Sequence, residues 1–383
     1  MTSVRSLSSF RCQHAISGTY HYQATPLFAQ KIPLRRMADR YQDLPAAARL
    51  YPTCPRILRE YAYLYTIPQQ SLPEQFIRPS DLRNEVTMQQ TYEQFRNDLA
   101  DFIRSIPGAK RDVSVRRVPK LNGVAYYGLT ILGEGETISP AIYLEPFYEM
   151  YREGMDLETI AGFVLKERGR HHVMPLPGNI FTEFSEVRDR IRYRVINYEM
   201  NRELLQDIPF RRVLDLAVVL YYTVDLQLND TATIFVRHES AKRWGVEEEN
   251  LFRLAESATP AADPPSVCPL TKVLREFGFE EDCCDEPGDV PLWIITNNRR
   301  TFGSACMLYP GVLAEAADAI GADLFILPSS IHEVLAMPDN GTLSREELEQ
   351  MVRQINATQV GRTEVLSDRV YSYRRGERAL TLL

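Results

Sequence analysis

Hydrophobic and polar positions along most of the chain switch between two periods, which predicts helices and strands in one mixed α+β fold. Apolar side chains recur every three or four residues over 92–106, the pattern of one face of an amphipathic helix. Alternation then runs through 113–118 and 126–132, and the Asn122-Gly123 pair between these runs is typical of a β-hairpin. The first organised part is therefore expected to be a helix followed by a hairpin.

The middle of the chain continues this mixture of helix and strand signals. Asp156 stands where an N-cap is expected, directly before a run with helical spacing. A Pro- and Ala-rich stretch over 257–268 predicts a linker. The other expected elements are an extended segment over 138–144, helices over 157–165 and 181–190, a strand over 191–200, a short helix over 201–206, strands over 214–224 and 232–238, and a helix over 246–258.

The last hundred residues repeat a strand, turn, strand, loop and helix order. Ser344 followed three residues later by Glu347 is a capping-box pattern, which predicts the start of a helix. The expected elements are strands over 292–296 and 305–308, a helix over 312–320, strands over 324–327 and 334–337, and a terminal strand pair that begins near 370. We therefore expect a mainly antiparallel sheet built from strand-turn-strand-helix units, behind an N-terminal helix and hairpin region.

Charge divides the chain near residue 88. Residues 1–87 carry 11 Lys and Arg against 6 Asp and Glu, whereas the following residues carry 33 against 45. We expect three regions: an N-terminal extension over 1–87, a helix and hairpin subdomain over 88–175, and a larger α+β subdomain over 176–383. The extension is interpreted as poorly ordered or as upstream sequence that precedes a true start at Met88. An organelle transit peptide is a third interpretation of its basic, Ser-containing beginning.

Composition narrows the classes of protein that the chain represents. With 383 residues and a net charge of −7, it is expected to bind the phosphate backbone of nucleic acids poorly. No apolar run approaches the roughly 18 residues that span a bilayer, and no secretory signal is seen, so no membrane partner is expected. Its 6 cysteines lack the spacing of a disulfide scaffold. A cytoplasmic location is the expectation.

The common catalytic and cofactor motifs are incomplete in this sequence. Gly133 and Gly135 are followed by Ile138 where a dinucleotide fingerprint requires glycine. His332 and Glu333 begin like a zinc-protease helix, but Ala336 stands in place of the second histidine. Cys283 and Cys284, with Cys268 and Cys306, lack the two-residue gap of zinc sites, and His171-His172 lies in a Pro- and Gly-containing loop. No metal and no cofactor are expected.

Four residues between two expected strands form the most chemically suggestive cluster. They are Ser329, Ser330, His332 and Glu333. Imidazole beside hydroxyls and a carboxylate suits acid–base chemistry or the binding of a small polar ligand. The alternative is a tight turn whose Ser and Glu side chains satisfy backbone groups. His332 and Glu333 are the candidate catalytic residues, and all four are candidate ligand-binding residues.

A second candidate is a row of alternating arginines. Arg188, Arg190, Arg192 and Arg194 would share one face of a strand and form a basic stripe for an anionic partner. The alternative is that these arginines pair with the acidic surplus elsewhere in the chain. Arg192 and Arg194 are retained as candidate ligand-binding residues.

Several blocks of residues resemble a bacterial family catalogued as domain of unknown function 5688. The blocks occur in the family's order over about 88–383, and they are Asn122-Gly123, Gly128-Leu129-Thr130-Ile131, Ile138-Ser139-Pro140, Leu214-Asp215-Leu216-Ala217, Trp244-Gly245-Val246, Leu308-Tyr309-Pro310-Gly311-Val312-Leu313, Leu327-Pro328-Ser329-Ser330-Ile331-His332-Glu333-Val334 and Glu364-Val365-Leu366-Ser367-Asp368. The order of elements after Ile191 is also similar to domain of unknown function 1444. The resemblance implies an intracellular bacterial protein and brings no assigned activity or catalytic residue.

These observations favour a binding or regulatory protein without catalytic activity, with an unidentified protein or small molecule as its partner. The alternative is a hydrolase-like enzyme that uses His332 and Glu333 as acid–base residues. A third hypothesis is a structural partner of another protein, which an exposed apolar patch or sheet edge would favour.

Overall fold

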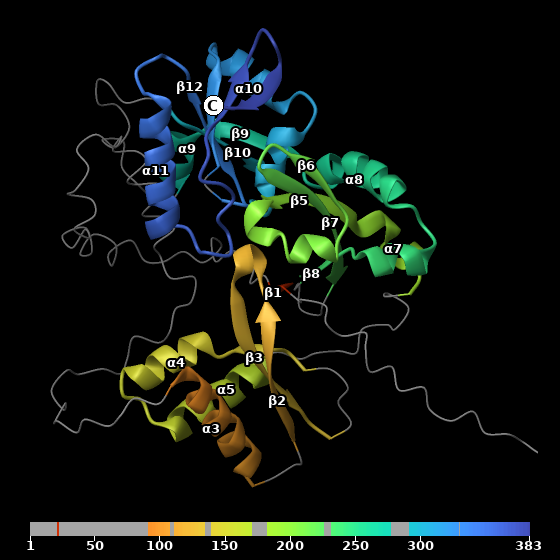
Figure 1. Cartoon of the computed structure of the whole chain (residues 1–383), viewed down its shortest axis with the longest axis vertical. Helices are drawn as coiled ribbons and strands as arrows, with labels where there is room; N and C mark the ends of the chain where they lie inside the picture. Colours follow the sequence, from red (N-terminus) through yellow and green to blue (C-terminus); the bar gives the residue numbers. More distant parts are fainter. Residues whose placement is uncertain are drawn as a thin grey trace, which may run out of the picture.

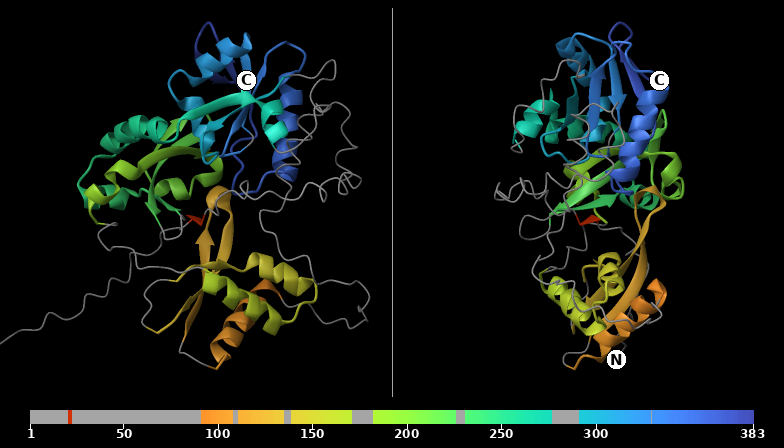
Figure 2. Two further views of the ribbon diagram at one scale, coloured as in Figure 1. Left: turned by 180° about the vertical axis from the view of Figure 1, so that it is seen from behind. Right: turned by 90° about the vertical axis from the view of Figure 1, so that its left-hand side faces the viewer.

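Three antiparallel β-sheets organise the protein, one in a small N-terminal lobe and two in a larger C-terminal lobe (Figures 1 and 2). The structure is a computed structural model that describes residues 21–22, 91–107, 111–134, 139–170, 182–225, 231–276, 291–328 and 330–383. The expected mixed α+β class with mainly antiparallel sheets is confirmed. Among the described residues, no helix is long and apolar enough to cross a membrane.

The N-terminal lobe packs its helices against one face of a three-stranded sheet in the order β2-β3-β4. Alternate strand residues such as Val113, Leu129 and Ile142 point to the helices and are buried with Phe95 and Ile160. The expected helix, hairpin, extended segment and second helix are confirmed. The elements are α3 (Tyr92–Ser105), β2 (Asp112–Pro119), β3 (Ala125–Leu132), β4 (Ile142–Tyr143), α4 (Glu145–Arg152) and α5 (Leu157–Arg170).

The first sheet of the C-terminal lobe is built around one long central strand, β7. Strand β5 pairs along one edge of β7, and β6 and β8 share its other edge. The two-residue strand β1 (His21–Tyr22) pairs with the outer edge of β8. The further elements are α6 (Phe184–Val187), the 3₁₀ helix η6 (Arg188–Arg190), β5 (Ile191–Asn197), η7 (Glu199–Asn201), η8 (Leu204–Gln206), β6 (Phe210–Val213), β7 (Leu216–Asp225), β8 (Thr231–Phe235), α7 (His238–Trp244) and α8 (Glu248–Ala262).

The second sheet of this lobe has the order β14-β13-β11-β12-β10-β9, with every neighbouring pair antiparallel. Helix α11 begins with the expected capping box, in which Ser344 and Glu347 bind each other's backbone N–H groups. The elements are β9 (Pro265–Pro269), α9 (Leu270–Glu276), β10 (Trp293–Asn297), η11 (Gly303–Leu308), α10 (Val312–Ile320), β11 (Leu324–Leu327), β12 (Val334–Pro338), α11 (Arg345–Thr358), β13 (Tyr371–Arg374) and β14 (Ala379–Leu382).

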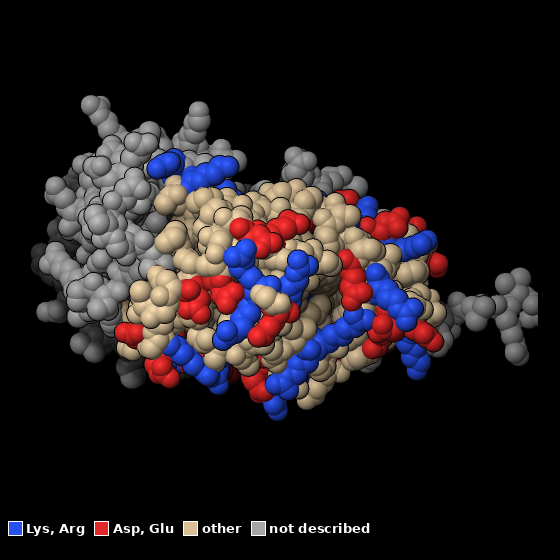
Figure 3. All heavy atoms as spheres, turned by 90° about the horizontal axis from the view of Figure 1, so that it is seen from above, with Lys and Arg blue, Asp and Glu red and all other residues tan. Residues whose placement is uncertain are grey.

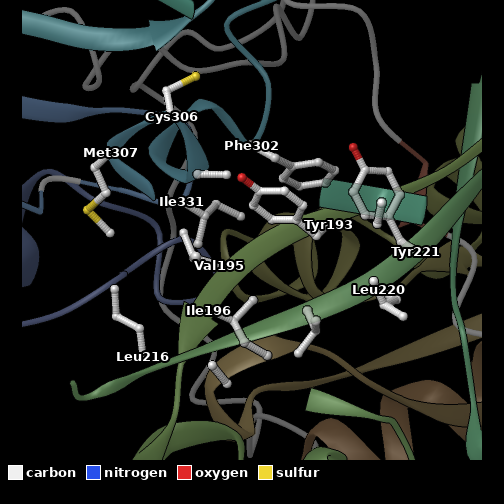
Figure 4. Close-up of a cluster of buried hydrophobic side chains, with 14 of the residues drawn as sticks. Tyr193, Val195, Ile196, Leu216, Leu220, Tyr221, Phe302, Cys306, Met307 and Ile331 are labelled. Carbon is white, nitrogen blue, oxygen red and sulfur yellow. The ribbon is translucent and has the colours of Figure 1, made fainter. Parts of the chain in front are cut away.

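The two sheets of the C-terminal lobe share one hydrophobic core. Val195 and Leu220 of the first sheet are buried in the same cluster as Ile295 and Val334 of the second. Figure 4 shows this cluster, in which side chains from β5 and β7 meet those of η11 and Ile331. The seam between the sheets is therefore closely packed, and it is the part of the fold that positions the candidate site.

Two sequence-based expectations about the C-terminal lobe are wrong. The segment 305–308, expected as a strand, belongs to η11, because a short and mostly buried apolar run carries no period that separates strand from helix. The expected linker over 257–268 is instead the end of α8 followed by β9. Thr259 in this stretch accepts a hydrogen bond from the N–H of Tyr193 (3.0 Å), so a tertiary contact holds α8 against β5.

The tip of the β2–β3 hairpin joins the two lobes (Figure 1). Asn122 adopts a left-handed conformation (φ 59°) that Asn tolerates better than most residues. Its N–H donates to Oδ1 of Asn201 (2.7 Å), and Nδ2 of Asn201 donates back to Oδ1 of Asn122 (2.7 Å). Its Nδ2 also donates to the carbonyls of Arg362 (2.9 Å) and Val365 (2.8 Å). The predicted turn therefore anchors the N-terminal lobe on the C-terminal lobe.

The proposed division of the chain at 88 and 176 stays a prediction. Apart from the two residues of β1, the extension over 1–87 lies outside the described residues.

Candidate functional site

The candidate residues of the sequence come from two places on the seam between the sheets. Ser330, His332 and Glu333 lie in the turn between β11 and β12, and Arg192 and Arg194 lie on β5. Ser329 lies outside the described residues, as do His171, His172, Cys283 and Cys284. The two groups are connected through a third segment, the loop that precedes η11.

Ser330 and Glu333 bind each other and hold the turn. The Ser330 hydroxyl donates to Oε1 of Glu333 (2.6 Å) and accepts the N–H of His332 (3.0 Å). The N–H of Ser330 donates to the carbonyl of Glu333 (3.3 Å). Both side chains are buried. These bonds match the structural alternative raised from the sequence, in which the Ser and Glu side chains satisfy a tight turn.

His332 is held by a loop that is distant in the sequence. Its ring lies parallel to that of Phe302, with centroids 5.8 Å apart and an interplanar angle of 11°. The N–H of Phe302 donates to Nδ1 of His332 (3.3 Å), which leaves the proton of the neutral imidazole on Nε2. Nε2 lies 3.7 Å from Oε1 of Glu364. The carboxylate that faces the imidazole edge is therefore Glu364, which the sequence analysis did not select.

The loop before η11 has an unusual backbone. Arg300 and Phe302 both have positive φ angles (53° and 54°), which L residues with a bulky side chain rarely adopt. Asn297 supports the loop, since its Oδ1 accepts the N–H groups of Arg299 and Thr301 and its Nδ2 donates to the carbonyl of Thr301. Strained backbone that the surroundings hold in place clusters at functional sites.

Gly303 follows Phe302 where no side chain fits. A Cβ at this position would lie 2.2 Å from Oγ1 of Thr296 and 2.6 Å from both the N of Asn297 and the carbonyl oxygen of His332. The close approach of β10, η11 and the β11–β12 turn therefore depends on a glycine here.

Arg194 also lies against Phe302, in a cage of aromatic rings. Its guanidinium carbon is 4.3 Å from the ring centroid of Phe302, 4.2 Å from that of Phe235 and 5.6 Å from that of Tyr221. The residue is 2% exposed, and its Nε has no hydrogen-bond partner. Burial lowers the pKa of Arg194 to about 10, so the group remains a cation at neutral pH.

No described carboxylate lies within ion-pair distance of Arg194, whereas Arg190 and Arg299 have acidic partners. The Asp225 carboxylate is 3.0 Å from Nη1 of Arg190, and the Asp263 carboxylate is 3.0 Å from Nε of Arg299. Across the described part of the chain, Arg194 is thus the buried cation without a counter-ion.

The expected four-arginine stripe is shorter than predicted, because β5 begins only at Ile191. Arg188 and Arg190 belong to η6, where the backbone does not alternate. Only Arg192 and Arg194 share the strand face, and Arg192 donates to the carbonyls of Asp189 (3.0 Å) and Ile191 (2.8 Å).

Three ionisable groups around this site, on Asp263, Tyr221 and Cys306, have raised pKa values. Burial raises the pKa of the Asp263 carboxyl, with Arg299 and Arg192 acting in the opposite direction. Burial and the Asp263 carboxylate raise the pKa of Tyr221 to about 12. Burial also raises the pKa of the Cys306 thiol to about 12. Neither Tyr221 nor Cys306 is therefore an activated nucleophile at neutral pH.

The described residues contain no group of three side chains suited to holding a metal ion. On the face shown in Figure 3, acidic and basic side chains are interspersed, so that face presents no broad patch of one sign. The chemistry of the described seam is accordingly that of one buried cation and one oriented imidazole, joined by an aromatic ring.

Phe302, Phe235 and Glu364 are the residues that the sequence analysis missed. Phe302 and Phe235 are apolar residues in apolar surroundings, and Glu364 is one acid among many, so no local pattern distinguishes them. The only available signal for Glu364 was its place in one of the blocks that resemble a family.

Comparison with known proteins adds a family but no activity. The model of the group described as "Family of unknown function (DUF5688)" matches residues 92–375. No curated protein and no solved structure gives a significant match. The similarity to domain of unknown function 1444 stays a prediction.

Proposed function

We propose that this chain, which belongs to the Family of unknown function (DUF5688), is a cytoplasmic bacterial binding protein without chemistry of its own, and that Arg194 holds the anionic group of its ligand. The observation that supports this proposal is the burial of the Arg194 guanidinium without a described carboxylate partner. The family has no assigned activity, so the proposal rests on this geometry.

Energetics favour an anionic ligand at this position. A buried charge that has lost its partner costs about 3–5 kcal/mol. Cation–π contacts of the kind made by Phe235 and Phe302 contribute about 0.5–2 kcal/mol each, which offsets part or most of this cost but leaves Nε without a hydrogen-bond acceptor. A carboxylate or phosphate oxygen would satisfy Nε with a charge-assisted hydrogen bond of about 1.5–3 kcal/mol. The cage is therefore better suited to a bound anion than to an unliganded state.

Neighbouring groups shape the expected ligand. Arg192 lies on the same strand face and adds positive charge, while the Asp263 carboxylate is already paired with Arg299. The aromatic walls exclude water and would strengthen any interaction between charges inside the cage. A small carboxylate or phosphate compound fits this description better than a polyanion, because Arg194 is 2% exposed.

The proposal is tested by ligand-dependent thermal stability of the full chain. Acetate, succinate and inorganic phosphate are titrated at constant ionic strength, with chloride as the reference anion. At about 100 times the Kd, a bound anion stabilises the folded state by about 2.7 kcal/mol, a readily measured rise in Tm. Arg194→Met should lose this rise.

Arg202→Met is the matched control, because Arg202 is exposed, pairs with Glu199 and lies over the ring of Tyr198, which is not part of the cage. It should keep the rise in Tm. Equal responses of wild type and Arg194→Met, or no response to any of the three anions, would contradict the proposal.

The enzyme alternative has one specific observation in its favour, the orientation of His332. Nε2 faces the Glu364 carboxylate at 3.7 Å, which forms an imidazole–carboxylate pair suited to proton transfer at that edge of the ring, while Nδ1 is occupied by the N–H of Phe302. Glu333, the acid–base partner suggested by the sequence, is occupied with Ser330. Hydrolysis of p-nitrophenyl acetate by wild type and not by His332→Asn would support this alternative and count against a purely binding role.

A further inference from the structure

A second unusual cation lies in the N-terminal lobe, at the turn of the hairpin that joins the lobes. Lys120 follows β2 directly and precedes η4. Its Nζ lies 2.6 Å from the hydroxyl of Tyr143 and 4.2 Å from the ring centroid of that residue. The ring centroid of Tyr126 is 6.0 Å from Nζ, and the two tyrosine rings are 5.5 Å apart. The amine therefore rests in a corner formed by two tyrosines.

These tyrosines lie on the sheet face that points away from the helices. Tyr143 pairs with Gly128, and Tyr126 is two residues from Gly128 along β3, so both side chains project to the same side. Ile142 and Leu129 project to the opposite side and pack with the helices. Lys120 is thus held on a face that the helices of this lobe leave uncovered.

Within the described ranges, no carboxylate lies within 4.0 Å of the Lys120 amine. The carboxylate that acts on it is Glu145, whose Oε1 accepts the hydroxyl of Tyr92 (2.8 Å) and the N–H of Tyr127 (2.7 Å). Burial outweighs the attraction of Glu145 and lowers the pKa of Lys120 to about 8. At pH 7, roughly a tenth of this amine is therefore unprotonated, far more than for an exposed lysine.

The hydroxyl of Tyr143 complements both protonation states of the amine. Burial raises the pKa of Tyr143 to about 12, so the hydroxyl keeps its proton. It accepts a hydrogen bond from the ammonium form and can donate one to the neutral amine. Tyr126 is also held neutral, because burial and the carboxylates of Glu145 and Glu364 raise its pKa, against the smaller effect of Arg362.

We propose that Lys120 is a nucleophilic amine that captures an aldehyde ligand as an imine. The Nζ lone pair adds to the carbonyl carbon, and proton transfer from nitrogen to oxygen gives the carbinolamine. The C–O bond then breaks as the Tyr143 hydroxyl protonates the departing oxygen, one water leaves, and the remaining N–H proton passes to the Tyr143 oxygen as the C=N bond forms. Lysine and aldehyde thus give imine and water without an oxidant or a reductant. The Tyr143 hydroxyl, 2.6 Å from Nζ, is placed to protonate the departing oxygen.

This inference is independent of the anion site, because it uses different residues in a different lobe. Its test is reductive alkylation of the wild-type full chain with propionaldehyde and cyanoborohydride from pH 6.5 to 9.5, followed by peptide mass spectrometry. Lys166 and Lys242, both exposed, serve as internal controls in the same molecule. At pH 7, alkylation of Lys120 should be at least about 10-fold faster than that of either control, since a lowered pKa exposes more free amine.

The pH profile separates a reactive amine from a merely accessible one. The rate at Lys120 should reach half its maximum near pH 8, whereas the control lysines should still be rising at pH 9.5. Tyr143→Phe keeps the ring and removes the hydroxyl, so it should lower the maximal rate without moving the midpoint upward. A Lys120 rate equal to that of the controls at pH 7, or a profile that parallels theirs, would overturn the proposal. An unchanged maximal rate in Tyr143→Phe would contradict the assignment of the Tyr143 hydroxyl as the proton donor.

Discussion

The imidazole of His332 lies flat against the ring of Phe302, and the backbone N–H of Phe302 donates to Nδ1 of that imidazole. The guanidinium carbon of Arg194 lies 4.3 Å from the centroid of the same phenyl ring. Two candidates that the sequence offered separately therefore belong to one stack. These contacts link the first sheet of the C-terminal lobe, which carries Arg194, to the second sheet, whose β11–β12 turn carries His332. A substitution at either residue should therefore affect the other.

Replacing His332 tests the hydrogen bond within this stack. His332→Ala removes the ring and leaves the Phe302 N–H without its acceptor, which should lower the free energy of unfolding by about 1–3 kcal/mol. His332→Asn offers an amide oxygen near the former Nδ1 and should recover part of this loss. Urea unfolding of the two variants measures the difference. Equal stabilities would show that the ring and not the acceptor matters.

In the absence of ligand, Arg194→Met should leave the free energy of unfolding unchanged or raise it, which is unusual for the replacement of a buried residue. Replacing a buried charge by an apolar side chain of similar length is often neutral or stabilises by about 1–4 kcal/mol. Methionine also retains favourable contacts with aromatic rings such as Phe235 and Phe302. We expect an unfolding free energy equal to or above that of wild type in chloride buffer. A loss of several kcal/mol would mean that a protein group already compensates the Arg194 charge.

Asn122 should contribute both its backbone conformation and its amide to the joint between the lobes. Asn122→Gly keeps access to the left-handed conformation and the backbone bond to Asn201 but removes the side-chain bonds to Asn201, Arg362 and Val365, so it should cost about 1–3 kcal/mol. Asn122→Ala adds backbone strain of about 1 kcal/mol. Denaturant unfolding ranks the variants, and limited proteolysis should cut between the lobes more readily in both. A more stable alanine variant would contradict the role of the left-handed turn.

Two glycines give opposite expectations for the same substitution. Gly303→Ala places a Cβ 2.2 Å from Oγ1 of Thr296 and 2.6 Å from two backbone atoms, so it should destabilise by about 3 kcal/mol or more. Gly162 lies inside α5, and beyond its chain neighbours and the backbone of that helix nothing lies within 4 Å of the position of an added Cβ. Gly162→Ala should stabilise by about 0.5–1 kcal/mol, because alanine favours the helix. Thermal unfolding distinguishes them, and a similar effect at both positions would contradict the close packing at Gly303.

Lys120 should make the stability of the protein depend on pH in a defined window. Its folded-state pKa of about 8 lies below the ordinary value of 10.5, so the unfolded chain binds more protons between these values and stability rises with pH. At neutral pH, Lys120→Met should therefore be more stable than wild type by about 1–3 kcal/mol.

The stability difference between wild type and Lys120→Met should shrink as pH rises through 8 and disappear above about 10.5, where the lysine is neutral in both states. Urea unfolding of both proteins from pH 7 to 10 checks this trend. Tyrosine titrations are shared by the two proteins and cancel in the difference. A constant difference across this range would mean that Lys120 has an ordinary pKa.

The amphipathic spacing of 92–106, the Asn-Gly turn at 122 and the capping box at Ser344 were all visible in the sequence. Each is a local signal, because it depends on residues within one or two turns of one another. These signals were sufficient for the α+β class and for most helices and strands. The joint between the lobes was not predictable, since the partners of Asn122 at Arg362 and Val365 are more than 200 positions away.

The sequence by itself thus determined the local elements and singled out Arg194 and His332 by residue type. Only the tertiary structure decided that Arg194 is buried without a described counter-ion, that Phe302 joins it to His332, and that Glu364 and not Glu333 faces the imidazole. The physical reason is that periodicity reports which face of an element is buried, whereas charge pairing depends on which distant segments pack against that face.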